Sequence, residues 1–245
     1  MTAADTILEV AGLVAGYGKM TILDGTGFRV ARGAITTIIG PNGAGKSTVF
    51  KTLFGLLPAR AGRVVFDGVD ITNAPPRTLL RLGVCYVPQG RNIFPELSVR
   101  HNLDLGAVVA EAGDVAPRIA AMLDRFPVLR RKADRQASTL SGGEQKLLEI
   151  ARGLLLDPKL VLIDEPSIGL SPIMVDETFH ILRGLRAKGV TVLMIEQNAK
   201  SALQLSDYGI VLELGRTRIE DRAAAILADP RLGQLFLGGA MTDIR

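Results

Sequence analysis

The chain has 245 residues, 47% of them hydrophobic and 22% charged, so it is long enough to bury a substantial core. Its net charge is only +4, it has no Trp, and aromatic residues make up 4%; this disfavours a base-stacking surface, and we expect no nucleic-acid partner. A single cysteine, Cys85, excludes an internal disulfide and fits a reducing compartment.

The sequence contains no apolar run that approaches the roughly 20 residues needed to span a bilayer. Its first residues also lack the basic segment with which a signal peptide begins. We therefore expect a soluble chain that works inside the cell and reaches a membrane only through another subunit.

Short apolar stretches alternate with glycines over residues 6–38, a pattern that predicts a small antiparallel β layer. Tyr17 lies in a glycine-flanked turn of this region, where its ring could stack on an adenine. An exposed Tyr in a turn is also unremarkable, so both interpretations stay open.

A phosphate-binding pattern follows, in which two glycines lie five positions apart and Lys and then Ser come next. A buried strand is predicted before it (34–39) and a helix after it (48–57), the context that this pattern requires. Backbone N–H groups freed by glycine and the helix N-terminus attract phosphate oxygens. We expect Lys46 to reach the β- and γ-phosphates and Ser47 to bind Mg²⁺, whereas the alternative is a glycine turn without a ligand. The residues of the pattern are Gly40, Pro41, Asn42, Gly43, Ala44, Gly45, Lys46, Ser47 and Thr48.

The next buried strand is predicted at residues 84–87, with Cys85 in the core. Gln89 is a neutral amide just past the carboxyl end of this strand, where open α/β sheets bind ligands. An exposed loop glutamine is the alternative. Helical periodicity then begins, and we interpret residues 90–157 as a helical insertion into an α/β core.

A second glycine pair stands just before a helix that is predicted over residues 146–156. Ser141 followed by Glu144 three positions later is a capping box, which is by itself a sufficient explanation of the pattern. Gly142 and Gly143 are costly near a helix start unless bare backbone N–H groups meet an anion there. We therefore predict a second phosphate-binding helix start.

The buried strand at 160–163 ends in two carboxylates, Asp164 and Glu165. Adjacent residues of a strand point to opposite sides, so the two acids have different roles. We expect Asp164 to hold Mg²⁺ and Glu165 to act as general base on the attacking water. By the same strand-end argument, Gln197 after the strand at 190–195 lies near the γ-phosphate. A hairpin (209–219), a short helix (223–227) and a frayed tail (238–245) complete the chain.

In this order, the features resemble the ATP-binding subunits of ABC transporters. The resemblance implies an α/β P-loop NTPase (RecA-like) core with an antiparallel β layer and a helical subdomain insertion. Residues 1–89 and 158–245 would form the core, and 90–157 the helical subdomain, of a single domain. The resemblance also adds Gln89 to the Mg²⁺ ligands and implies that Gln89 to Leu97 touch a membrane subunit.

Two such chains, identical or different, are expected to pack head to tail. ATP then lies between the Gly40–Thr48 loop of one chain and Ser141, Gly142 and Gly143 of the other, an arrangement that two anion-seeking helix starts in one chain also favour.

Residues 89–99 and 195–199 are similar to the LivF-like branch of this family, which implies ATP-driven import of branched-chain amino acids. Partners would be a second ATPase subunit, two membrane permeases and, indirectly, a periplasmic or extracellular solute-binding protein. The chain would sit peripherally on the cytoplasmic face of the membrane.

Two alternatives remain open. Importers of urea and short amides have similar subunits, and some ABC ATPases do not act in transport; the latter usually carry a long coiled-coil insertion or two ATPase halves. The chain departs from the common family pattern at Gln197, where most members carry a switch histidine, and at Ser171, where many carry Asp.

Overall fold

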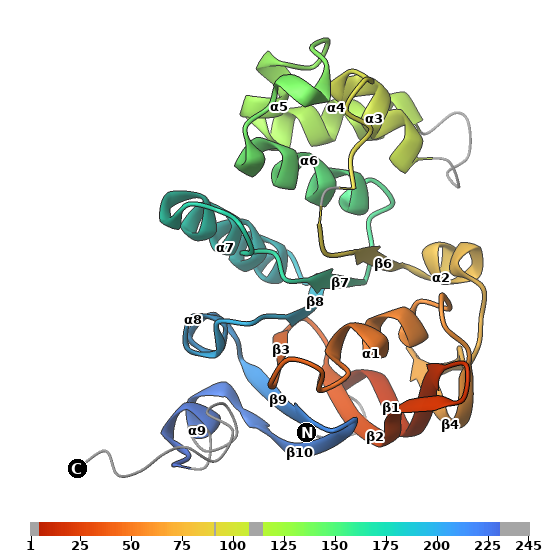
Figure 1. Ribbon diagram of the computed structural model, residues 1–245. Helices are drawn as coiled ribbons and strands as arrows, with labels where there is room; N and C mark the ends of the chain where they lie inside the picture. The colour runs from red at the N-terminus through yellow and green to blue at the C-terminus, as the bar shows by residue number, and fades with distance from the viewer. Residues whose placement is uncertain (1–4, 91, 108–114, 231–245) are drawn as a thin grey trace.

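The computed structural model of the chain describes residues 5–90, 92–107 and 115–230. The predicted tail at 238–245 lies outside these ranges. The described chain forms two sheets with helices between and beside them (Figure 1).

The N-terminal β layer is a four-stranded antiparallel sheet in the order β2-β1-β4-β5. The short apolar stretches predicted at 6–38 join into two strands of 12 residues each. Register shifts between them accommodate the glycines, and Gly12 and Gly25 adopt φ of 59° and 79°. The bounds are Thr6–Tyr17 (β1), Met20–Ala31 (β2), Ala59–Phe66 (β4) and Val69–Asp70 (β5).

The second sheet has six strands in the order β10-β9-β3-β8-β7-β6, with all pairs parallel except that of β9 and β10. Its inner strands are buried on both faces, which explains their continuous apolar runs. The bounds are Ile35–Ile39 (β3), Val84–Val87 (β6), Leu160–Asp164 (β7), Thr191–Ile195 (β8), Tyr208–Glu213 (β9) and Arg216–Arg222 (β10).

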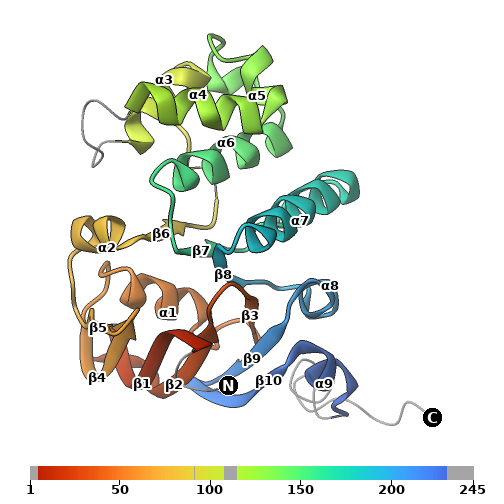
Figure 2. The ribbon, with the colours of Figure 1, turned by 180° about the vertical axis from the view of Figure 1, so that it is seen from behind.

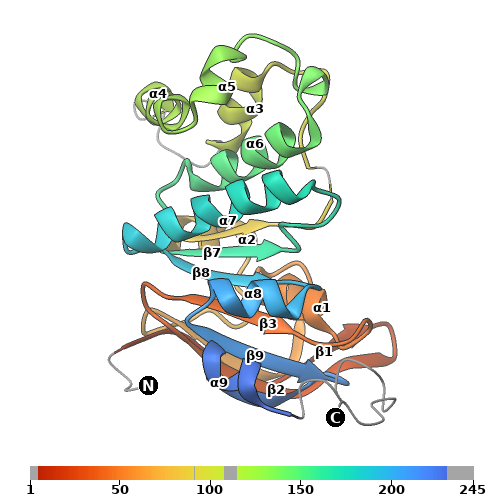
Figure 3. The ribbon, with the colours of Figure 1, turned by 90° about the vertical axis from the view of Figure 1, so that its left-hand side faces the viewer.

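Helix α1 (Lys46–Leu53) lies between the two sheets. Its Val49 and Phe50 pack in one cluster with Leu13 and Phe28 of the β layer and with Leu162 of β7. On the other face of the six-stranded sheet lies α7 (Pro172–Ala187). The remaining helices of the core are α2 (Pro76–Leu82), α8 (Ala199–Leu205) and α9 (Ala223–Ala228), which lie around the sheets (Figures 2 and 3).

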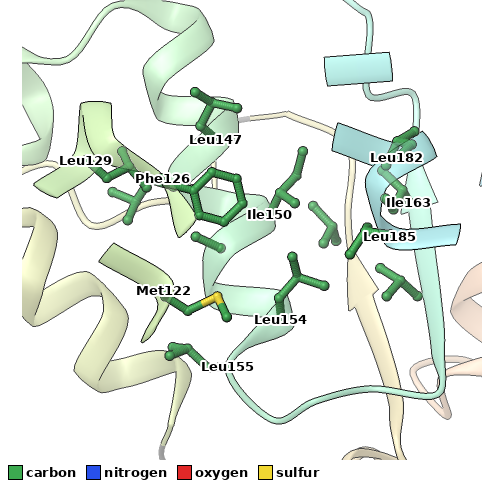
Figure 4. Packing of buried hydrophobic residues seen from close by; sticks show 14 of the residues in the cluster. Met122, Phe126, Leu129, Leu147, Ile150, Leu154, Leu155, Ile163, Leu182 and Leu185 are labelled. Carbon is green, nitrogen blue, oxygen red and sulfur yellow. The ribbon is translucent and has the colours of Figure 1, made fainter. Parts of the chain in front are cut away.

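Four helices gather at one end of the molecule, at the opposite end from the β layer (Figures 1 and 3). They fall within the segment predicted to be a helical insertion. Figure 4 shows how Phe126, Leu147 and Ile150 of this group continue the packing of Ile163, Leu182 and Leu185. The bounds are Val99–Gly106 (α3), Val115–Arg125 (α4), Pro127–Arg131 (α5) and Gly142–Leu154 (α6).

Candidate functional site

The loop between β3 and α1 depends on glycine at both ends. A Cβ on Gly40 would lie 2.1 Å from the carbonyl oxygen of Leu212, so no larger residue fits there. Gly45 is the N-cap of α1 with φ of 99°, a conformation that L side chains rarely adopt. The helix therefore begins at Lys46, two residues earlier than predicted, and its first N–H groups belong to the loop.

Lys46 is buried and folds back over the loop. Its ammonium Nζ donates to the carbonyl oxygens of Gly40 (2.8 Å) and Pro41 (3.1 Å). Burial lowers the pKa of Lys46, and the carboxylates of Glu165 and Asp164 oppose that shift. A cation thus stands at the loop, held near two acids.

A pocket of about 460 Å³ opens in front of the loop, within the range of small-molecule sites. It brings together the loop, both predicted strand-end amides and one of the two predicted acids. All lie at the carboxyl ends of parallel strands, where open α/β sheets bind ligands. Its lining is Ile22, Asn42, Gly43, Gly45, Lys46, Ser47, Thr48, Gln89, Glu165, Ile168 and Gln197.

Asp164 lies at the end of β7, on the strand face that continues Leu160 and Leu162 toward α1. It is 2% exposed; the Tyr86 hydroxyl donates to its Oδ2 at 3.4 Å, and its Oδ1 has no hydrogen-bond partner among the described residues. Burial raises the pKa of Asp164, while the hydroxyl of Ser47 and that of Tyr86 oppose the shift. An unpartnered buried carboxylate oxygen beside a serine hydroxyl suits a divalent cation.

Glu165 follows in the left-handed region, with φ of 49°. Its Oε2 accepts a hydrogen bond from Gln89 Nε2 at 2.7 Å, which joins the ends of β6 and β7. Burial and then the Asp164 charge raise the pKa of Glu165. The strained backbone aims the second acid into the pocket, away from the first.

Glu196 is a residue of this site that sequence analysis did not single out. It is 1% exposed and accepts from the backbone N–H and the hydroxyl of Ser167 (2.9 and 2.8 Å) and from the N–H of Gln197 (3.2 Å). It therefore ties the loop after β7 to Gln197. The sequence signal for Glu196 is an acid directly after an apolar strand. The strand-end argument was applied to Gln197, the next residue, and not to Glu196.

The second predicted helix start is separate from this pocket in the same chain. Ser141 and Glu144 form the predicted capping box, and α6 begins at Gly142, four residues earlier than expected. Gly142 is exposed, and a Cβ there would meet nothing within 4 Å among the described residues. Gly143 is buried against Met174 of α7, and a Cβ there would lie 2.1 Å from Met174 Cε. Packing alone thus accounts for Gly143, which corrects the argument that both glycines are explained only by an anion.

Several predicted site residues lie beside the pocket without lining it. Ala44 packs in the core, and Gly40 and Pro41 contribute carbonyl groups to Lys46. The ring of Tyr17 is half-exposed beside Lys51 of α1, with the ammonium 5.8 Å from its centroid. Its stacking on an adenine stays a prediction.

Comparison with known proteins identifies the family. The family model described as ABC transporter matches residues 23–168, which contain the loop, the Ser141 helix start and both acids. A high-affinity branched-chain amino acid transport ATP-binding protein of Pseudomonas aeruginosa is 42% identical, over 91% of this chain and 96% of its own length. A probable branched-chain amino acid transport ATP-binding protein of Archaeoglobus fulgidus is 37% identical, over 95% and 99%. The lipopolysaccharide export ATP-binding protein of Escherichia coli is 32% identical, over 94% and 97%.

Among solved structures, the ADP conformation of an ATP-binding cassette of an ABC transporter superimposes with a TM-score of 0.87 at 33% identity, covering 95% of this chain and 99% of that one. A nucleotide-free cassette matches with a TM-score of 0.86. None of the helices in the described ranges combines the length and the apolar character of a membrane span. By family match, identity and fold, the chain belongs to the ABC transporter family and is one of its ATP-binding proteins.

Proposed function

We propose that this ABC ATPase binds MgATP in the pocket at Lys46 and drives import of branched-chain amino acids through separate membrane permeases. The observation that carries the nucleotide site is the pocket itself. It gathers a glycine loop, a helix N-terminus and a buried ammonium on one side, and strand-end acids and amides on the other.

The loop holds the triphosphate. N–H groups at the start of α1 and the Lys46 ammonium face its negative charge, and the ammonium exchanges the carbonyl oxygens of Gly40 and Pro41 for phosphate oxygens. The exposed Tyr17 provides an apolar face for the adenine.

The residues around Asp164 fit Mg²⁺. Ser47, Gln89 and Asp164 supply a hydroxyl, an amide oxygen and a carboxylate, the oxygen ligands that this ion takes alongside phosphate. The bound ion would neutralise charge on the β- and γ-phosphates. Phosphate oxygens of the nucleotide would complete the ligand set.

Glu165 acts on the attacking water. The raised pKa of Glu165 makes its carboxylate a better proton acceptor than an ordinary glutamate. The hydrogen bond from the Gln89 amide fixes the orientation of this carboxylate. Gln197, held by Glu196, donates a hydrogen bond to the γ-phosphate. Most of the rate enhancement comes from positioning and from charge stabilisation by Lys46 and the loop.

A complete site needs a second chain. Ser141 and Gly142 present a helix N-terminus that does not line the pocket of its own chain. In a head-to-tail pair, this start covers the γ-phosphate bound by the partner's loop. The partner is a second ATPase subunit, and two permeases and a solute-binding protein complete the importer at the cytoplasmic face of the membrane.

Similarity favours branched-chain amino acids over other cargo. The two relatives with 42% and 37% identity are transport proteins for these solutes, whereas the lipopolysaccharide export relative reaches 32%. Proteoliposomes with the assembled transporter test the assignment. We expect ATP-dependent uptake of labelled leucine, isoleucine and valine; uptake of urea with no response to leucine would reject the assignment while leaving the ATPase intact.

The nucleotide site is tested separately by titration. Lys46→Ala removes the buried ammonium, and we expect at least about a tenfold loss of ATP affinity. Lys188→Ala is the control, because Lys188 is an exposed lysine at the C-terminal end of α7 and does not line the pocket. Unchanged affinity in Lys46→Ala would contradict the proposed site.

A further inference from the structure

Two side chains of α6 form hydrogen bonds to the backbone of a single residue, Asn92, in the loop after β6; we call this pair of contacts the Asn92 grip. Glu149 Oε1 accepts a hydrogen bond from the Asn92 N–H at 2.6 Å. One turn further along, the Arg152 guanidinium donates to the carbonyl oxygen of Asn92. Both peptide groups of Asn92 are therefore fixed to one helix.

The grip is built from buried charge. Glu149 pairs with Lys146 at 2.6 Å, and the two side chains are only 3% and 7% exposed. Burial also lowers the pKa of Arg152, which lies 5.4 Å from the ring centroid of Phe94. A buried ion pair is often no more stabilising than apolar residues of the same volume, so stability alone does not explain it. It does supply a charged acceptor at a fixed position, which makes a short, strong hydrogen bond.

The gripped residue leads directly to the hydrolysis site. The Asn92 side-chain amide donates to the carbonyl groups of Pro88, Gln89 and Gly90, which ties Asn92 to the residues that follow β6. Gln89 in turn donates to Glu165. In the other direction, Glu149 lies seven residues from Gly142 on α6, or about 10 Å along one rigid helix.

We propose that Glu149, with Lys146 as its counter-ion, is a positioning residue that couples Gln89 at the hydrolysis site to the Ser141–Gly142 helix start. When Gln89 moves to accommodate the γ-phosphate, the grip on Asn92 moves α6 with it. The helix start then takes the position in which it meets the partner's nucleotide. This inference rests on the proposed function.

The test compares two double variants of the purified full chain. Lys146→Met/Glu149→Met keeps volume and helix propensity but removes the acceptor for Asn92 N–H. Lys146→Gln/Glu149→Gln is the matched rescue, because its amide oxygen can still accept that N–H. Arg186→Leu controls for the loss of an ion pair elsewhere in the chain. Arg186 pairs with Asp207, which accepts a hydrogen bond from Ile35 at the start of β3, whereas the phosphate-binding loop follows the other end of that strand.

We expect the Met pair to lower kcat at least about tenfold while the Kd for ATP changes less than about twofold, and the Gln pair to stay within about threefold of wild type. Gln89→Ala should cost less in the Met pair than in the wild-type chain, because the link from Gln89 to α6 is already broken there, while its contacts to Glu165 and Mg²⁺ are lost in both. Multiplicative losses, an unaffected kcat in the Met pair, or a Gln pair as slow as the Met pair would each overturn the coupling. A wild-type chain without ATPase activity would instead reject the proposed function.

Hydrogen exchange gives a second test should the Met pair fail to fold. In dilute monomeric wild-type protein, ATP should slow exchange both in the segment after Gln89 and in the first turn of α6. A response confined to the Gln89 segment would overturn the coupling.

Discussion

At the scale of single residues, Asp164 is a buried acid whose environment opposes its charge. Burial raises its pKa above the ordinary 3.8, and its Oδ1 lacks a partner among the described residues. The folded state therefore binds the proton more tightly than the unfolded state does. The contribution of this carboxyl to stability is fully present below pH 3.8 and is lost as pH rises through the raised pKa.

Asp164→Asn should therefore stabilise the nucleotide-free protein at neutral pH. We expect a melting temperature about 2–4 °C higher in EDTA, the shift that roughly 1 kcal/mol produces in a chain of this size. The difference from wild type should shrink as pH falls toward 4, because the raised pKa lets the wild-type carboxyl take up its proton at a higher pH than an ordinary Asp does. Mg²⁺-dependent ATP binding should weaken in the variant. Thermal unfolding at both pH values checks this, and a less stable variant at neutral pH would show that the carboxylate has a compensating partner.

Glu165 has a strained backbone conformation at the position proposed to activate the attacking water. A non-glycine residue with φ of 49° costs about 1–2 kcal/mol, yet it aims the carboxylate into the pocket. Glu165→Gln keeps the shape and an acceptor for Gln89 but cannot take a proton. We expect at least about a 100-fold loss of turnover with ATP affinity retained, as measured by phosphate release and nucleotide titration.

The matched variant at this position is Glu165→Gly. It should be as inactive as Glu165→Gln, although glycine relieves the backbone strain and raises stability relative to Glu165→Ala. Turnover at the wild-type rate in Glu165→Gln would assign the general base to another group.

At the scale of elements, both glycine-containing helix starts differ from their predicted positions in the same direction. Periodicity placed the first helical residues at 48 and 146, where apolar spacing begins, but the helices start at Lys46 and Gly142. Capping decides the start: Gly45 in the left-handed region for α1 and the Ser141 side chain for α6. Since apolar periodicity reports packing and not capping, the glycine residues of each loop were left outside the helices.

Substitution of the two glycines at the start of α6 should have different effects. Gly142→Ala meets open space, so stability should be unchanged or slightly higher, while turnover falls about tenfold or more because the new methyl group obstructs the partner's nucleotide. Gly143→Ala collides with Met174 and should cost about 1–3 kcal/mol of stability. Thermal unfolding and phosphate release on both variants check this. A fully active Gly142→Ala would remove the helix start from the site.

At the scale of the whole molecule, the sequence predicted the strands better than their order in space. Asp164, Gln89 and Gln197 could each be located because polar residues follow buried strands, and parallel strands end at one edge. That β3 lies between β8 and β9, and that Glu196 reaches Ser167, depends on long-range pairing that no local pattern encodes. The residues of the site were therefore predictable, but the contacts that hold them were not.

The surface around the pocket has an apolar rim on one side. Ile168 lines the pocket and is 45% exposed, and Ile173, at the start of α7, is 78% exposed. Ile168 lies in the loop that follows the acid pair, and Ile173 lies just after this loop. Exposed apolar residues beside the pocket favour burial against a second chain. The proposed head-to-tail pair provides such a chain, together with the helix start that the pocket lacks.

Ile173→Asp should therefore prevent pairing without affecting the pocket. In a Glu165→Gln background, where ATP stays bound, we expect the chain to become dimeric with MgATP, and the added Ile173→Asp to leave it monomeric with the Kd for ATP within about twofold. Sedimentation velocity at several protein concentrations measures the change. Leu56→Asp is the control, because Leu56 is similarly exposed but lies past the far end of α1 from the loop. A dimer that persists in Ile173→Asp and dissociates in Leu56→Asp would place the interface on the opposite face, and the Ser141 helix start could not then reach a partner's nucleotide.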